Sequence, residues 1–352
     1  GRLTIIIAIL IFSIIILFHE FGHFVLAKRN GIKVTEFALG MGPKLIGIQK
    51  GETLYSIRLL PFGGYCAMLG EDAASDEEVP EGDKGRTFNA KGVWQRISVV
   101  AAGPIFNFIL AFIFAMFIVS VIGYDTPVVY DTQEGGPAYE AGLRKGDVIK
   151  SINGHDIHMY KEFRAYILFE GSEHTSFEIV YERDGVEHTT YVTPVDNGSG
   201  AYQILLSGGE YEKTDFFGVL KYSFYEVKYW ITTTIQSLGM LVQGQVTADD
   251  VSGPVGIVSM IGETYQAARE YGALDVALNL ANICILLSAN LGVMNLLPIP
   301  ALDGGRLVFL LLEAIRRKPV SREKEGMVHT VGLMLLMALM VFIMFNDVRK
   351  LF

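Results

Sequence analysis

The chain has 352 residues, of which 51% are hydrophobic and 19% are charged, and its mean hydropathy is +0.36. This composition is too apolar for an ordinary soluble domain and indicates a polytopic membrane protein. The net charge of −9 owes much to residues 71–83, where seven of thirteen side chains are acidic, and we expect a solvated loop there. The basic residues form no tract typical of a nucleic-acid site, so nucleic acid is excluded as a partner.

Four stretches are long and apolar enough to cross a bilayer, which needs about 20 helical residues. They span residues 3–27, 97–122, 276–302 and 327–346. A fifth candidate, 216–242, carries several charges, and we expect it to be an amphipathic helix in the membrane interface. The sequence therefore predicts a mainly α membrane protein, divided into regions 1–122, 123–200, 201–275 and 276–352.

The first apolar stretch ends in His19-Glu20-Phe21-Gly22-His23, an H-E-x-x-H pattern. Residues four apart share one face of a helix, so His19 and His23 can bind one Zn²⁺ while Glu20 polarises a water molecule. The alternative is a pair of interfacial histidines that end a helix. Ionisable groups within apolar segments are costly and are usually functional, which favours the zinc site.

A catalytic zinc site normally has three protein ligands, and Asp303 is the candidate for the third. Pro298 and Pro300 interrupt the helix before it, and Gly304-Gly305 allow the backbone to turn after it. A solvated aspartate in a loop is the alternative interpretation. Lysine and arginine residues follow both Asp303 and the first helix, so the positive-inside rule predicts a cytoplasmic position for both.

Residues 44–69 contain two strand-like pieces, 45–49 and 53–60, followed by a glycine-rich bend at 61–65. The segment is too apolar for a solvent-exposed loop, so we expect a membrane-associated β-hairpin on the cytoplasmic side. A strand edge here can hold an extended substrate by strand addition. The alternative is a hairpin that only plugs the helix bundle.

Residues 123–200 have the polar composition and turn signals of a small α+β module on the extracytoplasmic side. Asn153-Gly154 and Asp184-Gly185 predict turns, with strands at 176–182 and 186–192 and short helices near 137–142 and 160–169. We expect the glycine-rich passage 137–147 to expose backbone N–H groups that can bind a peptide carboxylate. We interpret the remaining histidines as surface residues, and Cys66 and Cys284 as small packing residues; the histidines are His155, His158, His174, His188 and His329.

The H-E-x-x-H pattern, the 295–305 segment with Leu302-Asp303-Gly304 and the inserted PDZ-like module resemble the site-2 protease family of intramembrane zinc metalloproteases. The bacterial RseP/RasP group is the most similar, although this chain has a single PDZ-like module rather than two in tandem. The resemblance extends over essentially the whole chain, through residues 61–65, Gly103-Pro104 with Asn107, and 252–256.

The resemblance implies a zinc metalloendopeptidase in the bacterial cytoplasmic membrane that acts in regulated intramembrane proteolysis. It would cut single-pass proteins, such as anti-sigma factors or remnant signal peptides, within or near their transmembrane segments. His19, His23 and Asp303 would bind Zn²⁺, and Glu20 would be the general base and acid. The PDZ-like module would bind a peptide C-terminus. The implied substrate-binding residues are Asn295, Pro298, Pro300, Phe62, Gly63, Gly64 and Tyr65.

Two other functions are compatible with parts of the sequence. The chain could be a catalytically silent membrane adaptor that binds peptides through its PDZ-like module, or a transporter that uses the polar third helix. Glu20 argues against the adaptor, because a structural zinc site does not need it. The sequence also has no inverted repeat of the kind that many transporters carry.

Overall fold

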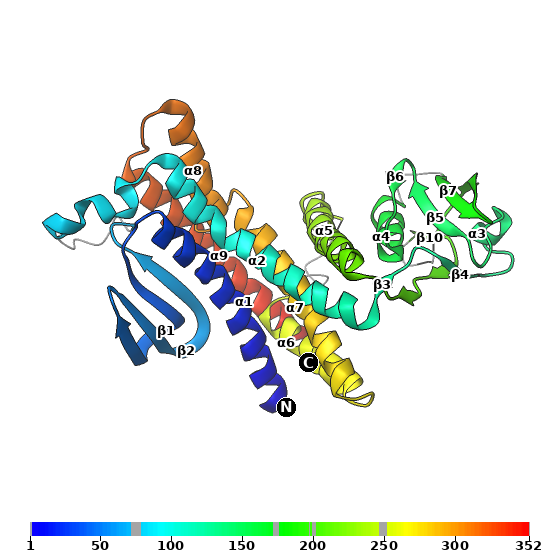
Figure 1. Cartoon of the computed structure of the whole chain (residues 1–352), viewed down its shortest axis with the longest axis horizontal. Helices are drawn as coiled ribbons and strands as arrows, with labels where there is room; N and C mark the ends of the chain where they lie inside the picture. The colour runs from blue at the N-terminus through cyan, green and yellow to red at the C-terminus, as the bar shows by residue number, and fades with distance from the viewer. Residues whose placement is uncertain are drawn as a thin grey trace. The chain divides into compact units, whose positions relative to one another are not determined.

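The computed structural model describes residues 2–71, 79–171, 176–196, 198, 202–245 and 252–351 (Figure 1). Acidic residues 72–78 of the predicted solvated loop, and His174, lie outside this part of the chain. The chain forms two compact units, one made of residues 1–114 and 237–352 and the other of residues 115–236.

Four helices in the described part of the chain are long and apolar enough to cross a membrane. They are α1 (Arg2–Arg29), α2 (Val93–Ile122), α7 (Ala273–Leu296) and α9 (Arg322–Leu351). These four helices confirm the predicted spans and an integral membrane protein. α7 ends earlier than the predicted 276–302, because the backbone turns extended at Leu297 and two prolines follow.

The predicted amphipathic helix is present as α5 (Phe216–Val242). It is not among the helices that meet the length and hydropathy of a membrane span in the described chain. Its position in the membrane interface stays a prediction.

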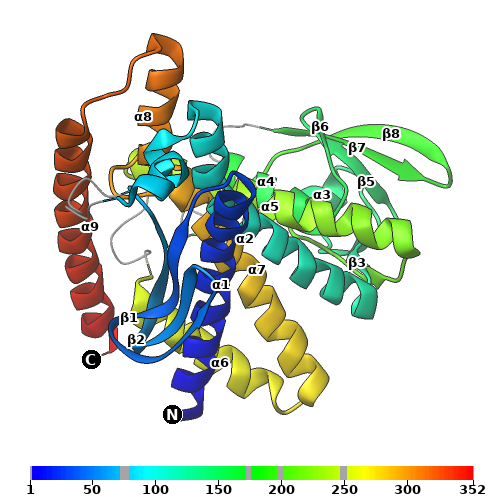
Figure 2. The same cartoon turned by 60° about the vertical axis from the view of Figure 1, so that its left-hand side comes forward.

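Strands β1 (Val34–Lys50) and β2 (Thr53–Met68) form a longer hairpin than the sequence predicted (Figure 2). The outer parts pair from Lys50↔Thr53 to Lys44↔Arg58. The inner part of β1 has two partners, since Ala38 lies opposite both Ser56 and Tyr65. The expected glycine-rich bend at 61–65 is present: Gly63 has a φ of 79°, and residues 64–68 fold back alongside the start of β1.

Glu36 joins three segments of this hairpin through its carboxylate. It accepts hydrogen bonds from Ser56 Oγ at 2.5 Å, from Arg58 Nη2 at 2.7 Å and from Tyr65 Oη at 2.7 Å. Burial would raise the pKa of Glu36, but these hydrogen bonds outweigh it and lower the pKa below its usual range. The charge of Glu36 therefore stabilises the folded-back end of β2.

Two helices in the membrane unit did not stand out in the sequence. The first, α6 (Pro254–Ala268), packs with α1, α2 and α7 around an apolar cluster that includes Ile15, Ile261 and Cys284. Its N-terminus is capped by Asp347 near the end of α9, whose carboxylate accepts from Gly253 N at 3.0 Å and Gly256 N at 2.9 Å. The 252–256 motif is thus a helix start held by the last helix of the chain.

The second unpredicted helix, α8 (Asp303–Arg316), begins at the candidate third ligand. It has a strong apolar face, and Leu310 packs into a cluster with Ala27, Cys66 and Val99. Glu313, about one turn further along α8, pairs with Arg96 of α2. α8 therefore fixes the backbone that follows Asp303 against α1, α2 and the hairpin.

The other unit contains the small α+β module. Its four-stranded sheet has the order β6-β5-β7-β8, formed by β5 (Val148–Ile152), β6 (His155–Asp156), β7 (Phe177–Arg183) and β8 (Val186–Val192). Both predicted turns are confirmed, because Asn153-Gly154 and Asp184-Gly185 have positive φ at both residues, as a type I′ hairpin turn requires. The predicted helices are α3 (Pro137–Glu140) and α4 (Tyr160–Glu170).

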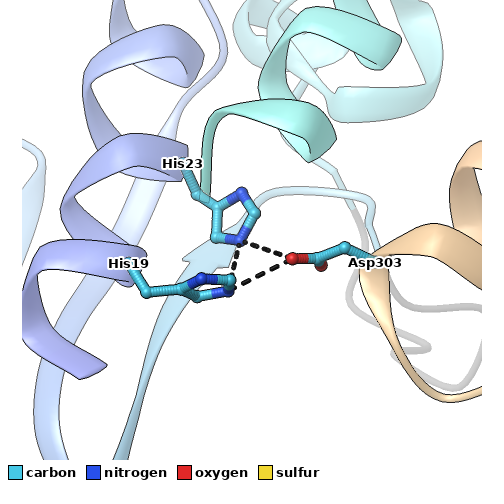
Figure 3. Close-up of side chains that lie close together, drawn as sticks. All are labelled: His19, His23 and Asp303. Atoms are coloured by element: carbon cyan, nitrogen blue, oxygen red, sulfur yellow. Dashed lines mark hydrogen bonds and ion pairs between the residues drawn. The ribbon is translucent and has the colours of Figure 1, made fainter. Parts of the chain in front are cut away.

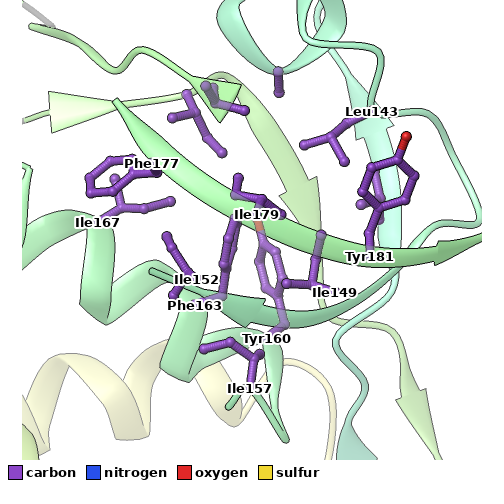
Figure 4. Close-up of a cluster of buried hydrophobic side chains, with 14 residues drawn as sticks. Leu143, Ile149, Ile152, Ile157, Tyr160, Phe163, Ile167, Phe177, Ile179 and Tyr181 are labelled. Carbon is purple, nitrogen blue, oxygen red and sulfur yellow. The ribbon is translucent and has the colours of Figure 1, made fainter. Parts of the chain in front are cut away.

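The core of the module lies between α4 and the sheet, where Phe163, Phe177 and Ile179 are almost fully buried (Figure 4). Five short strands complete it: β3 (Tyr124–Asp125), β4 (Val129–Thr132), β10 (Tyr202–Gln203), β11 (Leu206–Gly208) and β12 (Tyr211–Glu212). β10 pairs with β9 (Val195–Asp196), while β11 and β12 pair with β4 and β3. The module therefore continues to Glu212, beyond the predicted boundary at residue 200.

The passage 137–147 does not offer the free backbone N–H groups that the sequence suggested. The N–H groups of Ala141, Gly142 and Leu143 bond to carbonyl groups of α3, and Arg144 N bonds to the Asp147 carboxylate at 2.8 Å. Asp147 is itself held by Arg183. These donors are used within the module, and binding of a peptide carboxylate elsewhere in the passage stays a prediction.

The first turns of α5 pack on the module through a buried ion pair. Lys161 Nζ lies 2.8 Å from both carboxylate oxygens of Glu226, and Trp230 Nε1 donates to Glu226 at 3.2 Å. The His158 ring stacks on Tyr225 with centroids 3.9 Å apart. The interpretation of His158 as a surface residue is therefore wrong, because it belongs to the contact between α4 and α5.

Candidate metal centre

The two histidines of the H-E-x-x-H motif lie on the buried face of α1. The buried positions of this helix recur every three or four residues and include Ile11, Ile15, His19, His23 and Ala27. Each histidine is only 8% exposed. The helical repeat that buries the apolar residues of α1 therefore also turns both imidazoles into the helix bundle.

Asp303, the first residue of α8, meets these two histidines (Figure 3). Its Oδ2 atom lies 3.1 Å from His19 Nε2 and 3.5 Å from His23 Nε2, and the two Nε2 atoms are 3.2 Å apart. In the described chain this is the group of three His, Cys, Asp or Glu side chains that could hold a metal ion. The structure thus brings together the three residues predicted as ligands, from opposite ends of the sequence.

The hydrogen-bond partner of each Nδ1 atom fixes the tautomer of the imidazole, and so determines whether its Nε2 atom presents a lone pair to Asp303. His23 Nδ1 lies 2.8 Å from the Val99 carbonyl oxygen, which can only accept, so Nδ1 carries the proton and Nε2 of the neutral ring does not. His19 Nδ1 lies 3.1 Å from the amide of the fully buried Asn107. Asn107 Oδ1 is otherwise buried without a hydrogen-bond partner in the described chain, and turning the amide so that Oδ1 accepts from His19 Nδ1 gives His19 the same tautomer.

This arrangement fits a bound cation. Three lone-pair atoms, the two Nε2 atoms and Asp303 Oδ2, then converge without a proton to share among them. Asp303 Oδ2 is buried and has no hydrogen-bond partner in the described chain. Two imidazoles and one carboxylate are also a donor set that zinc uses in catalytic sites.

Glycines on α1 and α2 let the two helices approach closely enough to hold the site. A Cβ atom at Gly103 would collide with His23 Nε2 and would lie 2.7 Å from Cε1 of His19. A Cβ atom at Gly22 would collide with the Ala102 carbonyl group. Any side chain at Gly103 would therefore occupy the space in front of the metal-binding nitrogen atoms.

The segment between α7 and α8 is folded tightly beneath Asp303. Cβ atoms at Gly304 and Gly305 would collide with the carbonyl oxygens of Leu297 and Ile299. Ala301 has a φ of 75°, a left-handed conformation that is unfavourable for a residue with a side chain. Both glycines predicted to allow the turn are thus required by it, and Ala301 is held in a strained state.

The end of β2 runs beside the motif. A Cβ atom at Gly64 would lie 3.6 Å from Cγ of Glu20 and 2.9 Å from the Ala38 carbonyl oxygen. In the described chain, residues 64–68 pair with β1 along one edge only. Gly63 packs against Met41, and Tyr65 bonds to Glu36. The predicted substrate-binding residues Gly63, Gly64 and Tyr65 therefore lie on a strand edge next to Glu20.

The other predicted substrate-binding residues are spread along the segment after α7. Asn295 is half-buried in the last turn of α7, Pro298 is exposed, and Pro300 packs under Gly332 of α9. The side chain of Phe62 lies outside the described residues. The structure thus leaves the roles of these residues as predictions.

Several residues of the site were not assigned a role from the sequence. Asn107 and Gly103 were noticed only as parts of a motif in the second helix, and their polarity and small size in an apolar span are the signal that could have found them. The Val99 carbonyl has no sequence signal at all. His329 accepts a hydrogen bond from Ala301 N at 2.8 Å, so its interpretation as a surface residue is wrong.

Comparison with known proteins agrees with this geometry. The profile of peptidase family M50 matches residues 7–339. The chain belongs to peptidase family M50, the site-2 protease family. A relative named zinc metalloprotease RasP, from Bacillus licheniformis, is 36% identical over 99% of both chains. The regulator of sigma-W protease RasP from Bacillus subtilis is 34% identical over 99% of both chains.

A solved PDZ domain of an SdrC-like protein from Listeria monocytogenes matches 24% of this chain and 88% of its own, with 24% identity and a TM-score of 0.21. That score is too low to carry an argument. Membership of family M50 makes the chain a zinc metalloprotease of regulated intramembrane proteolysis, and zinc is its metal.

Proposed function

We propose that this M50 protease cuts a substrate peptide bond at the centre formed by His19, His23 and Asp303, within or near the transmembrane segment of a single-pass protein. The observation that carries the proposal is the convergence of three lone-pair atoms beside Glu20 and a strand edge that is unpaired in the described chain. His19, His23 and Asp303 hold the zinc ion. When bound, zinc supplies a Lewis acid and brings the pKa of water to about 7.

Glu20 then carries the proton transfers. It follows His19 on α1 and lies beside Gly64, on the side of the helix where a substrate on the β2 edge would pass. As general base Glu20 takes a proton from the attacking water, and as general acid it gives a proton to the leaving amine. Because the site is buried, the Glu20 carboxylate stays close to both the attacking water and the leaving amine.

The β2 edge at 63–65 is the proposed binding place of the substrate backbone. A helical substrate shields its own amide groups, and unwinding it in lipid costs several kcal/mol for each unsatisfied group. Pairing with a strand edge satisfies those groups next to Glu20. Gly64 leaves no side chain between the added strand and α1. Asn295, Pro298 and Pro300, at and after the end of α7, are the other residues proposed to contact the substrate.

We place the centre on the cytoplasmic side of the bacterial inner membrane and the module of residues 123–212 outside. Lys28 and Arg29 end α1, and Arg316 ends α8, so positive charge gathers on the side of the site. Anti-sigma factors and remnant signal peptides are the proposed substrates. The module, which we propose to be PDZ-like, screens them or binds their C-terminus.

The test compares the wild type with Glu20→Gln on a reporter that contains one transmembrane segment. We expect the variant to retain one zinc ion per chain and to lose cleavage by about 10³-fold, within the range of general base catalysis. Asp303→Ala should lose both zinc and cleavage. Retained cleavage by Glu20→Gln would overturn the mechanism, and a zinc-loaded wild type that cleaves no transmembrane segment would favour a peptide-binding adaptor.

A further inference from the structure

The last helix of the chain contacts the segment that carries the third ligand. His329 of α9 faces the 297–302 segment, where its Nδ1 atom accepts from Ala301 N at 2.8 Å. One turn further along α9, Gly332 lies so close to Pro300 that a Cβ atom would lie 2.8 Å from the Pro300 carbonyl oxygen. The two contacts fix neighbouring residues of the same turn.

The residue held by His329 is the strained one. Ala301 has a φ of 75°, and a residue with a Cβ atom adopts this conformation only where its surroundings enforce it. Asp303 follows two residues later, so a change of backbone at Ala301 rotates the start of α8 and moves the Asp303 carboxylate. Leu302 N bonds to the Ile299 carbonyl oxygen at 3.2 Å and closes this turn from within, and the hydrogen bond from Ala301 N to His329 holds it from α9.

The ring of His329 is positioned for this one bond. Because Nδ1 accepts a hydrogen bond it carries no proton, so the ring is neutral and its proton is on Nε2. Nε2 is buried without a hydrogen-bond partner in the described chain, and the Glu325 carboxylate is 4.0 Å away. The ring also packs against Phe309 of α8, with centroids 5.7 Å apart. α9 thus touches both sides of Asp303 in sequence, through Ala301 before it and Phe309 after it.

We propose that His329 is a positioning residue for the metal centre: it holds Ala301 in its left-handed conformation and thereby directs Asp303 towards His19 and His23. The proposal rests on the function proposed for Asp303. It gives α9, which otherwise presents mainly exposed apolar side chains, a defined part in metal binding. Loss of the Ala301 hydrogen bond leaves the two histidines in place but lets the third ligand turn away.

The experiment measures zinc affinity of the full chain in detergent by chelator competition, together with reporter cleavage. His329→Leu removes the acceptor, and we expect about tenfold weaker zinc binding, the lower end of the range for residues that orient metal ligands. His329→Asn places a carbonyl oxygen near the position of Nδ1 and should restore most of the affinity. Thr330→Leu is the matched control, because its exposed hydroxyl bonds within α9 to Gly326.

A second-site change separates positioning from simple packing. Glycine adopts a positive φ without strain, so Ala301→Gly should recover at least half of the affinity that His329→Leu loses. A merely structural role of His329 would not respond to a change in the backbone preference of Ala301. Ala301→Gly alone closes the double-mutant cycle, and additive effects would overturn the proposal.

The outcomes also distinguish this proposal from the function on which it rests. If Asp303→Ala keeps wild-type zinc affinity, the assignment of the third ligand fails and the role of His329 fails with it. If Asp303→Ala loses zinc but His329→Leu binds it as tightly as the wild type, only the positioning role is refuted. Equal losses in His329→Leu and Thr330→Leu would likewise refute it, since both would then report general damage to α9.

Discussion

The candidate metal centre and the core of the α+β module are both buried, but they are built in opposite ways. At the metal centre each polar ligand has its own partner: the Val99 carbonyl for His23, the Asn107 amide for His19 and the held turn for Asp303. The module core is instead a cluster of fourteen mainly apolar side chains between α4 and its sheet. The metal centre depends on the positions of single polar atoms, whereas the module core depends on how completely its side chains fill the interior.

The largest effect should come from placing one methyl group in the metal centre. In Gly103→Ala the new Cβ atom collides with His23 Nε2. Relieving this collision would force α2 away from α1. We expect zinc to be lost from the purified protein and cleavage to disappear, as measured by metal analysis and the reporter.

Gly239→Ala is the matched control, because it also adds a methyl group to a helical glycine but meets no atom within 4 Å. One zinc ion per chain in Gly103→Ala would contradict the close packing of α2 on the two imidazoles.

The next effect should appear in the module and leave the metal centre unchanged. Phe163 is 1% exposed, and truncation to alanine typically costs about 3–5 kcal/mol. We expect hydrogen exchange of β5 and β7 to speed up by the corresponding factor, with zinc content as in the wild type. Loss of zinc in Phe163→Ala would show that the two regions are not independent.

A smaller effect is expected when a partner of a ligand is removed. Asn107→Leu keeps the side-chain size but loses the group that faces His19 Nδ1, so zinc affinity should fall about 10- to 100-fold. Asn107→Asp, which can accept from the same nitrogen, should lose less.

Ser288→Ala is the control for that prediction, because Ser288 Oγ donates to the Asn107 backbone carbonyl at 2.7 Å without touching His19. It should lower thermal stability by about 1 kcal/mol and leave zinc affinity unchanged. If Asn107→Leu binds zinc as tightly as Ser288→Ala does, Asn107 does not orient His19.

The smallest effect concerns the hairpin and depends on pH. The pKa of Glu36 is lowered in the folded hairpin, so its stabilisation is present above the unfolded pKa of about 4.3 and is lost as the pH falls through the folded value. In the wild type, the protection factors for hydrogen exchange at residues 63–68 should therefore fall as the pH drops below the unfolded pKa of about 4.3. Glu36→Gln should exchange faster at pH 7 and show a flatter pH dependence, whereas an equal pH dependence would exclude Glu36 as the cause.

The same contrast explains what the sequence could predict. The Asn153-Gly154 and Asp184-Gly185 turns, the β8 strand and the four apolar spans follow from local patterns, and all are confirmed. The pairing of His19 and His23 is also local, because it needs only the helical repeat. Asp303 was found because prolines and glycines around it mark a break in a helix.

The features that were missed depend on contacts between distant residues. The bend at 61–65 was predicted, but the pairing of residues 64–68 with 34–39 was not, because it leaves no simple alternating pattern. α6 and α8 are short amphipathic helices whose apolar faces find partners only in the folded bundle. His329 contacts a backbone N–H group, and a backbone partner carries no sequence signal.

The distance along the chain between the ligands has a consequence for how the enzyme is made. His19 and His23 emerge early during synthesis, whereas Asp303 follows the third membrane helix, and the contacts of His329 and Asp347 arrive with the fourth. A chain whose last helices have not entered the bilayer holds two histidines and no third ligand. With the ligand set proposed above, peptidase activity would begin only once insertion is complete, and an incompletely assembled molecule would not cut its neighbours in the membrane.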